Sequence, residues 1–292
     1  MVRLWKFLLF TNILIASAAA AQVLLSYDIF GLPYDYNIVF LEFFATLLLY
    51  NLSIWNSRPK NYKESPYERT RWIFGNMYVF WSISAISLLA LVFILPQIHI
   101  HTFLYLMVIG GLSLAYAMPI VKVDGKWRSF RHVPYVKVFH IALIWSLSTV
   151  GLVYIEIVQN MGDLVSWTSL FYLLACKFLF ILLITLPFDI RDMKQDSYYH
   201  LKTLPLALGL EKSQRLCYTL AVLHVFLLLF MPTNLGVKVG LGLCDILVLI
   251  LFKTKIFKDK DSFINVYLLD LILVIQFALS FLGVQVFDNF IR

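Results

Sequence analysis

Residues 178–196 read FLFILLITLPFDIRDMKQD. The first part closes an apolar run over about 168–188, which is long enough to cross a bilayer as a helix of about 20 residues. Asp189, Asp192 and Asp196 follow directly. If the chain stays helical, positions i, i+3 and i+7 lie on one face. The stretch therefore predicts three carboxylates together where a helix leaves the membrane.

Carboxylates that share a helix face repel one another unless a cation binds between them. Their hard oxygen atoms suit Mg²⁺, which proteins usually hold with few carboxylates and the phosphates of a substrate. We therefore expect Asp189, Asp192 and Asp196 to be metal ligands and catalytic residues. The alternative is a solvated loop of mixed charge, because Arg191 and Lys194 are interleaved with the aspartates.

The composition extends this membrane interpretation to the whole chain. Of the 292 residues, 61% are hydrophobic and only 14% are charged, against about 25% charged in an average soluble domain. Long continuous runs also argue against an outer-membrane barrel, whose strands alternate. We predict a single all-α transmembrane domain over 1–292, with about nine helices around a central cavity. The apolar runs are roughly 7–26, 38–56, 73–95, 102–121, 137–157, 168–188, 215–232, 235–252 and 264–287.

The basic residues fall on alternate loops. Most of the 24 Lys and Arg residues lie near the N-terminus or in the loops after the second, fourth, sixth and eighth runs. The positive-inside rule then predicts a cytoplasmic N-terminus, and we expect a bacterial cytoplasmic membrane. The net charge of +7 reflects this topology, and we expect no nucleic-acid partner.

Two of the basic loops carry further candidate ligands for phosphate. Lys202 follows the aspartates in HLKTLPLALG, where a lysine can face phosphate oxygens as a point charge. After the fourth run, Tyr116 precedes Lys122, Arg128 and Arg131, which could receive a diphosphate. Either set could instead be ordinary loop cations that only set the orientation in the membrane.

These stretches resemble the UbiA-type intramembrane prenyltransferase superfamily. FDIRDMKQD is similar to the second aspartate-rich motif of that family, and HLKTLPLALG to the segment that follows it. YAMPIVKVDGKWRSFRHVPYVKVF resembles the loop after its fourth helix. The resemblance implies nine helices, Mg²⁺ as cofactor and an allylic diphosphate as substrate, with Tyr116, Lys122, Arg128, Arg131 and Lys202 among the substrate-binding residues.

The first aspartate-rich motif of that family is missing. The family pattern is Asn-Asp-x-x-Asp-x-x-x-Asp. The corresponding stretch here, residues 50–59, reads YNLSIWNSRP, in which Asn51 matches the leading Asn but no aspartate follows. Neutral side chains cannot replace the lost negative charge. We expect Asn51 and Arg58 to contact the substrate, with Arg58 pairing directly with the diphosphate. The alternative is that prenyl transfer has been lost.

Four ionisable residues lie inside the apolar runs: Glu42, Lys177, Asp245 and Asp270. Such residues are costly in a membrane and usually face a cavity or a partner. Two interpretations of these charges are compatible with the sequence. One is a Lys–Asp ion pair between helices, and the other is a polar site for the acceptor.

Three functions are compatible with the sequence. The first is prenyl transfer from an allylic diphosphate to an aromatic or lipid acceptor. The second is a non-catalytic relative that binds an isoprenoid lipid or a protein in the bilayer. The third is a secondary transporter that uses the four intramembrane charges, but the chain lacks the paired Gly/Pro-broken helices typical of that class.

Overall fold

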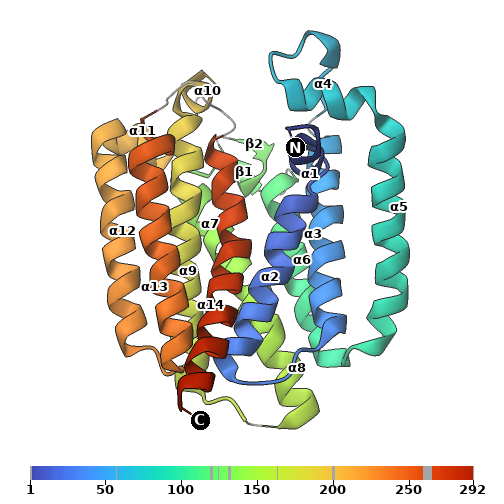
Figure 1. The fold of residues 1–292 in the computed structure, drawn as a ribbon. Coiled ribbons are helices and arrows are strands. Elements are labelled where there is room, and N and C mark those ends of the chain that lie inside the picture. The colour runs from blue at the N-terminus through green and yellow to red at the C-terminus, as the bar shows by residue number, and fades with distance from the viewer. Residues whose placement is uncertain are drawn as a thin grey trace.

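The computed structural model describes residues 2–56, 58–118, 121–123, 125–130, 133–162, 164–198, 201–258 and 265–291. It is almost entirely helical (Figure 1). A two-stranded antiparallel hairpin, β1 (Val121–Val123) and β2 (Lys126–Arg128), follows the fourth long helix. The helices are α1 (Val2–Phe10), α2 (Ile13–Phe30), α3 (Tyr36–Asn56), α4 (Glu68–Gly75), α5 (Met77–Ile94), α6 (Ile100–Ala117), α7 (Val136–Ser146), α8 (Leu152–Met161), α9 (Trp167–Arg191), α10 (Met193–Tyr198), α11 (Leu204–Leu208), α12 (Leu210–Phe230), α13 (Leu235–Leu251) and α14 (Leu268–Ile291).

The helices confirm the all-α membrane fold. Within the described residues, eight helical segments are long and apolar enough to cross a membrane, and the apolar helix at 100–116 is somewhat shorter. Together they correspond to the nine predicted runs. One span joins α7 and α8 through a π-helical turn at Leu147–Gly151. The protein is therefore a multi-pass integral membrane protein.

The two ends of the helices differ in charge. The N-terminus, α4, the hairpin, α10 and α11 lie at one end, which is the top of Figure 1, and we call it the basic end. The loops after the second, fourth, sixth and eighth apolar runs lie at this basic end, with those of their Lys and Arg residues that the structure describes. The opposite end holds the turn between α2 and α3, the end of α8 and the C-terminus of α14. Loops that are rich in Lys and Arg and loops that have few thus lie at opposite ends of the bundle.

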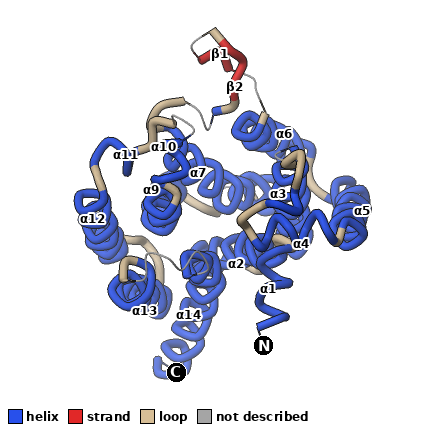
Figure 2. Tube along the Cα trace, turned by 90° about the horizontal axis from the view of Figure 1, so that it is seen from above, coloured by secondary structure: helices blue, strands red, loops and turns tan. Residues whose placement is uncertain are grey.

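Seen from the basic end, the helices form a ring (Figure 2). Helix α14 packs against both α13 and α2, α2 packs against α3, and α9 lies between α7 and α12. Helix α5 contacts α3 on the outside of the ring, and many of its apolar side chains are exposed. Such side chains face lipid in a membrane, so the exposure is consistent with the predicted bilayer partner.

The first span is interrupted near the basic end. Asn12 adopts a left-handed conformation with φ of 63° and separates α1 from α2. Asparagine is enriched in this region because its short amide side chain bonds locally. The interruption turns the Asn12 side chain, together with Leu9 of α1, towards the interior of the ring, where both line a cavity.

Candidate active site

The aspartate-rich stretch lies at the basic end of α9. Pro187 lies inside the helix, and the regular helix ends at Arg191. The turn nevertheless continues, because the backbone N–H of Asp192 bonds to the Phe188 carbonyl at 3.0 Å and that of Asp196 bonds to the Asp192 carbonyl at 2.8 Å. The nearly helical path brings Asp189 and Asp196 to the same side.

Lys137 of α7 joins these two aspartates. Its Nζ lies 2.8 Å from Asp189 Oδ1 and 3.3 Å from Asp196 Oδ2. Both aspartates are buried, at 4% and 5% exposure. A buried carboxylate is costly unless it is paired. Lys137 supplies that pairing for both residues.

Asp192 has a different partner. Arg191 Nε donates to Asp192 Oδ1 at 2.7 Å, and its Nη2 donates to Oδ2 at 3.0 Å. The guanidinium also lies over the rings of Phe188 and Tyr267, at 5.2 and 5.6 Å from their centres. The three predicted aspartates are thus close in space but divided between two cations. Within the described residues, no three Asp, Glu, His or Cys side chains form a group that could hold a metal ion by themselves.

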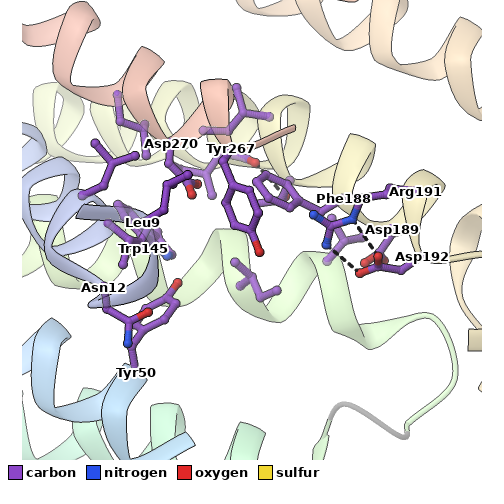
Figure 3. Close-up of a pocket in the computed structure, with 18 of the residues that line it drawn as sticks. Leu9, Asn12, Tyr50, Trp145, Phe188, Asp189, Arg191, Asp192, Tyr267 and Asp270 are labelled. Carbon is purple, nitrogen blue, oxygen red and sulfur yellow. Dashed lines mark hydrogen bonds and ion pairs between the residues drawn. The ribbon is translucent and has the colours of Figure 1, made fainter. Parts of the chain in front are cut away.

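These charged residues line a cavity of about 260 Å³, which we call the charged cavity (Figure 3). Asp189 and Asp192 reach it from α9, Asp270 from α14 and Arg69 from α4. Its walls carry three cations and three carboxylates, with aromatic side chains between them. The charged residues are Arg69, Lys137, Arg191, Asp189, Asp192 and Asp270. Arginine binds phosphate oxygens with two parallel hydrogen bonds, so the cavity has the chemistry to receive a phosphate-bearing group.

The wall opposite α9 carries amides and an arginine. Asn12 Nδ2 donates to Asn51 Oδ1 at 2.9 Å, and Asn51 Nδ2 donates to Ser84 Oγ at 2.9 Å. Arg69 Nη2 donates to Asn12 Oδ1. Asn51 is buried and does not line the charged cavity. Its position therefore favours holding Asn12 and Arg69, which line the cavity, over contacting a substrate directly.

Arg58 does not line the charged cavity either. The side chain is exposed, and its guanidinium lies over the rings of Trp55 and Phe74 at 5.3 and 5.5 Å. The arginine that reaches the cavity from this part of the chain is Arg69. Contact of Arg58 with a substrate stays a prediction: α4 carries Arg69 over the cavity, while the Arg58 guanidinium lies on aromatic rings outside it.

The charged cavity adjoins two others, with which it shares lining residues. An apolar cavity of about 370 Å³ shares Tyr50, Ile141 and Trp145 with it. A groove of about 830 Å³ at the basic end shares Arg69, Arg191 and Asp192. A molecule with a charged head and an apolar tail would find matching surfaces along this series.

The remaining predicted site residues are dispersed. Tyr116 lines the apolar cavity and stacks on His140 with ring centres 5.6 Å apart. Lys122 is exposed on the hairpin, with its Nζ 5.3 Å from the centre of the Trp127 ring. Lys202 is exposed, and its backbone carbonyl accepts a bond from the Tyr135 N–H. Arg128 belongs to β2, but its side chain lies outside the description, as does the whole of Arg131.

The four intramembrane charges occupy four separate settings. Glu42 lines the apolar cavity and Asp270 the charged cavity. Lys177 donates to Gln22, and Asp245 lies 2.9 Å from His224. Among the described residues the expected Lys–Asp pair is not formed, because a buried amide and an imidazole supply the partners. Within the described residues, none of the four is hydrogen-bonded or ion-paired to another.

Comparison with solved structures identifies the fold. The structure of a UbiA homologue from Archaeoglobus fulgidus bound to GPP and Mg²⁺ is 15% identical, with a TM-score of 0.61, covering 96% of this chain and 99% of that one. A UbiA homologue from Aeropyrum pernix K1 is 13% identical, with a TM-score of 0.63, and the match covers 94% of this chain and 96% of that one. A structure described as digeranylgeranylglyceryl phosphate synthase is 16% identical, with a TM-score of 0.56, and the match covers 97% of this chain and 99% of that one. The chain has the UbiA fold. No protein-family model matches the chain, and no curated protein matches its sequence.

This match confirms the fold that the resemblance implied. Nearly the whole chain takes part in the match, so the fold is not confined to the aspartate-rich region. The sequence analysis did not single out three residues of the charged cavity: Asn12, Arg69 and Lys137. It did name Asp270, as an intramembrane charge expected to face a cavity or a partner. Arg69 and Lys137 belong to the basic loops, where they resemble ordinary loop cations. Nothing in the local sequence marked Asn12.

Proposed function

We propose that this protein is a UbiA-like intramembrane prenyltransferase. It transfers a prenyl group from an allylic diphosphate to an acceptor that is aromatic or lipid. The observation that carries the proposal is the pair of adjoining cavities, one charged and one apolar, which share the walls formed by Tyr50, Ile141 and Trp145. The UbiA homologue from Archaeoglobus fulgidus, which has the same fold, was solved with GPP and Mg²⁺ and with DMAPP and Mg²⁺.

The cations of the charged cavity would bind the diphosphate. Arg69, Lys137 and Arg191 line it together, and guanidinium groups match phosphate oxygens in geometry and charge. When the allylic C–O bond breaks, the diphosphate leaves with the electron pair. Fixed cations in a site with little water stabilise that developing charge. The acceptor then attacks the allylic cation and loses a proton.

The carboxylates of α9 fit a Mg²⁺ ion that is shared with the substrate. Asp189 Oδ2 is buried and has no hydrogen-bond partner within the described residues. Asp192 lines both the charged cavity and the groove at the basic end. Mg²⁺ is usually held by one or two carboxylates plus phosphate oxygens, so a dedicated cluster of three is not needed. Asp189 and Asp192 would hold the ion, which supplies further positive charge beside the diphosphate.

Asp196 takes another role in this proposal. Its carboxylate is bonded to Lys137, which also contacts Asp189. We assign Asp196 to positioning Lys137 rather than to the metal. The prenyl tail would enter the apolar cavity past Tyr50, Ile141 and Trp145. Aromatic faces at that junction shield a cation and keep water away from it.

The test is Mg²⁺-dependent turnover of a labelled allylic diphosphate by purified protein in detergent. We expect diphosphate release in the wild type and a loss of about a hundredfold or more in Asp189→Asn and Asp192→Asn, because each removes a charge beside the reacting group. Glu211→Gln is the matched control, since Glu211 is exposed on α12 and far from the cavity lining. Release that is equal in all four proteins would refute the proposal.

The missing first motif favours one alternative. A non-catalytic relative would bind an isoprenoid diphosphate without cleaving it, with Lys137 neutralising the aspartates permanently. Binding across several chain lengths, without diphosphate release in the presence of aromatic and lipid acceptors, would support that function.

We also propose that the basic end faces the cytoplasm. Its Lys and Arg residues follow the positive-inside rule, and the diphosphate would then enter from the cytoplasmic side. The test uses a Lys63→Cys variant, in which the introduced cysteine lies in the basic loop before α4. Treatment with a thiol reagent that reaches only the cytoplasmic face should block later labelling of this cysteine. The bacterial cytoplasmic membrane stays a prediction from the sequence.

A further inference from the structure

A separate cavity of about 400 Å³ lies at the end of the bundle opposite the charged cavity. The turn between α2 and α3 forms one side, and the last turns of α8 form the other. It shares no lining residue with the charged cavity or with the apolar cavity. We call it the distal cavity. Nothing in the proposed prenyl transfer requires it.

The distal cavity contains a buried carboxylate with an open oxygen. Glu156 is 2% exposed, and its Oε1 accepts a bond from Asn160 Nδ2 at 3.0 Å. Asn160 is itself fixed by His99, whose Nε2 lies 2.8 Å from Asn160 Oδ1. Glu156 Oε2 is buried and has no hydrogen-bond partner within the described residues. Burial of a carboxylate oxygen that has no cation or hydrogen-bond donor beside it costs free energy. A ligand with a positive charge or an N–H or O–H donor at Glu156 Oε2 would remove that cost.

Tyrosine rings surround the same space. The rings of Tyr27 and Tyr34 meet edge to face at 6.3 Å, and those of Tyr34 and Tyr36 at 6.2 Å, and all three residues line the cavity. Tyr34 OH donates to Asp28 at 2.5 Å, which fixes its ring. Burial and the Asp28 carboxylate raise the pKa of Tyr34, so the hydroxyl remains protonated. Aromatic faces arranged around a space bind organic cations.

The lining is anionic. Glu156 and Asp35 contribute carboxylates, and no Lys or Arg is among the lining residues of the described chain. Asp35 also accepts the Asn37 backbone N–H at 2.9 Å, which fixes its side chain. Across the residues that the structure describes, no three Asp, Glu, His or Cys side chains form a complete set of metal ligands here. The combination of spaced carboxylates, aromatic rings and a space of this size fits a polyatomic cation better than a metal.

We propose that the distal cavity binds an organic ammonium group, with Glu156 Oε2 facing the charge and the rings of Tyr27, Tyr34 and Tyr36 around it. This chemistry occurs in two sources, the amine headgroup of a membrane lipid and a free amine in solution. Both can reach this end of the bundle, where the helices meet the membrane surface.

The first experiment is calorimetric titration of the purified protein in detergent with choline and with ethanolamine. We expect saturable binding of at least one of them, weakened roughly tenfold or more by Glu156→Gln, because a charge-assisted contact is lost. Asp35→Asn is a second variant in a half-buried loop position and should also weaken binding. Glu211→Gln should bind as the wild type does. Size-exclusion profiles establish that each variant is folded.

Two probes distinguish this proposal from its competitors. The neutral choline analogue 3,3-dimethyl-1-butanol should not bind, and Mg²⁺ should not displace choline. Absence of binding by both amines, unchanged affinity in the folded Glu156→Gln protein, or equal binding of the neutral analogue would each overturn the proposal.

Nanodiscs separate the two sources. A lipid source predicts that phosphatidylethanolamine, added to phosphatidylglycerol nanodiscs, raises the unfolding temperature of the wild type and not of Glu156→Gln. A free-amine source predicts no such lipid effect, while choline or ethanolamine in solution still raises the unfolding temperature. Neither result depends on prenyl transfer, because the distal cavity and the charged cavity have no residue in common.

Discussion

The stretches after α3 and after α9 occupy comparable places at the basic end, yet their chemistry is opposite. Three aspartates lie in the last turn of α9 and just beyond it, and two of them are buried against one lysine. Near the end of α3 lie Asn51, which is bonded to other side chains, and, just beyond the helix, Arg58, which lies on aromatic rings. No carboxylate from 51–59 lines the charged cavity.

The two walls of the charged cavity therefore differ in charge. Arg69 approaches the cavity from α4, opposite the carboxylates of α9, and is bonded to Asn12. A wall that held metal through carboxylates would bind phosphate indirectly, whereas a guanidinium binds it directly. The three predictions below test whether the two walls differ in this way.

Lys137→Met should have the largest effect. It leaves Asp189 and Asp196 buried without their cation, which costs about 3 kcal/mol of the free energy of unfolding. It also removes a cation from the charged cavity, so we expect turnover to fall about a hundredfold. Thermal unfolding and diphosphate release in detergent measure the two losses.

The control for that prediction is Asp196→Asn, which keeps the Lys137–Asp189 pair. It should unfold closer to the wild type than Lys137→Met does. If both variants were as stable as the wild type, the lysine would not be the cation that holds the α9 wall together.

Arg69→Gln should have an intermediate effect. Loss of a charge-assisted bond to phosphate predicts an increase of about tenfold in the KM for the allylic diphosphate. The matched variant is Arg58→Gln, whose side chain lies outside the charged cavity and should leave KM within about twofold of the wild type. Steady-state kinetics at saturating Mg²⁺ compare them, and the reverse order would return Arg58 to the substrate site.

Lys122→Ala and Lys202→Ala should have the smallest effect. Both side chains are exposed and neither lines the charged cavity, so we expect turnover within about twofold of the wild type. A tenfold loss in either variant would show that the loops close over the substrate and that a second cationic shell exists.

The sequence predicted the fold well because each span is a continuous apolar run. Runs of about 20 apolar residues have few alternatives in a bilayer, where every backbone group must be bonded within the segment. The division of the first span at Asn12 was not predictable, because no glycine or proline marks it.

The candidate site was predicted in part. Asp189 and Asp192 line the charged cavity, which agrees with the motif at the end of the sixth run. Lys137 could not be distinguished from an ordinary loop lysine, since its partners lie 52 and 59 residues away. Arg69 was missed because the short helix α4 folds back over the cavity. Roles that depend on such distant contacts require the three-dimensional structure.

The contact between α2 and α14 determines when the site is complete during synthesis. Gln22 of α2 donates to the Leu273 carbonyl of α14 at 2.7 Å, across 251 residues of sequence. Asp270, near the start of the same α14, lines the charged cavity beside residues from α1 and α4. A ribosome adds about 5 to 20 residues per second, so the first span waits tens of seconds for this partner. During that interval the Gln22 amide N–H lacks its α14 partner, and the cavity lacks Asp270 until α14 enters the membrane.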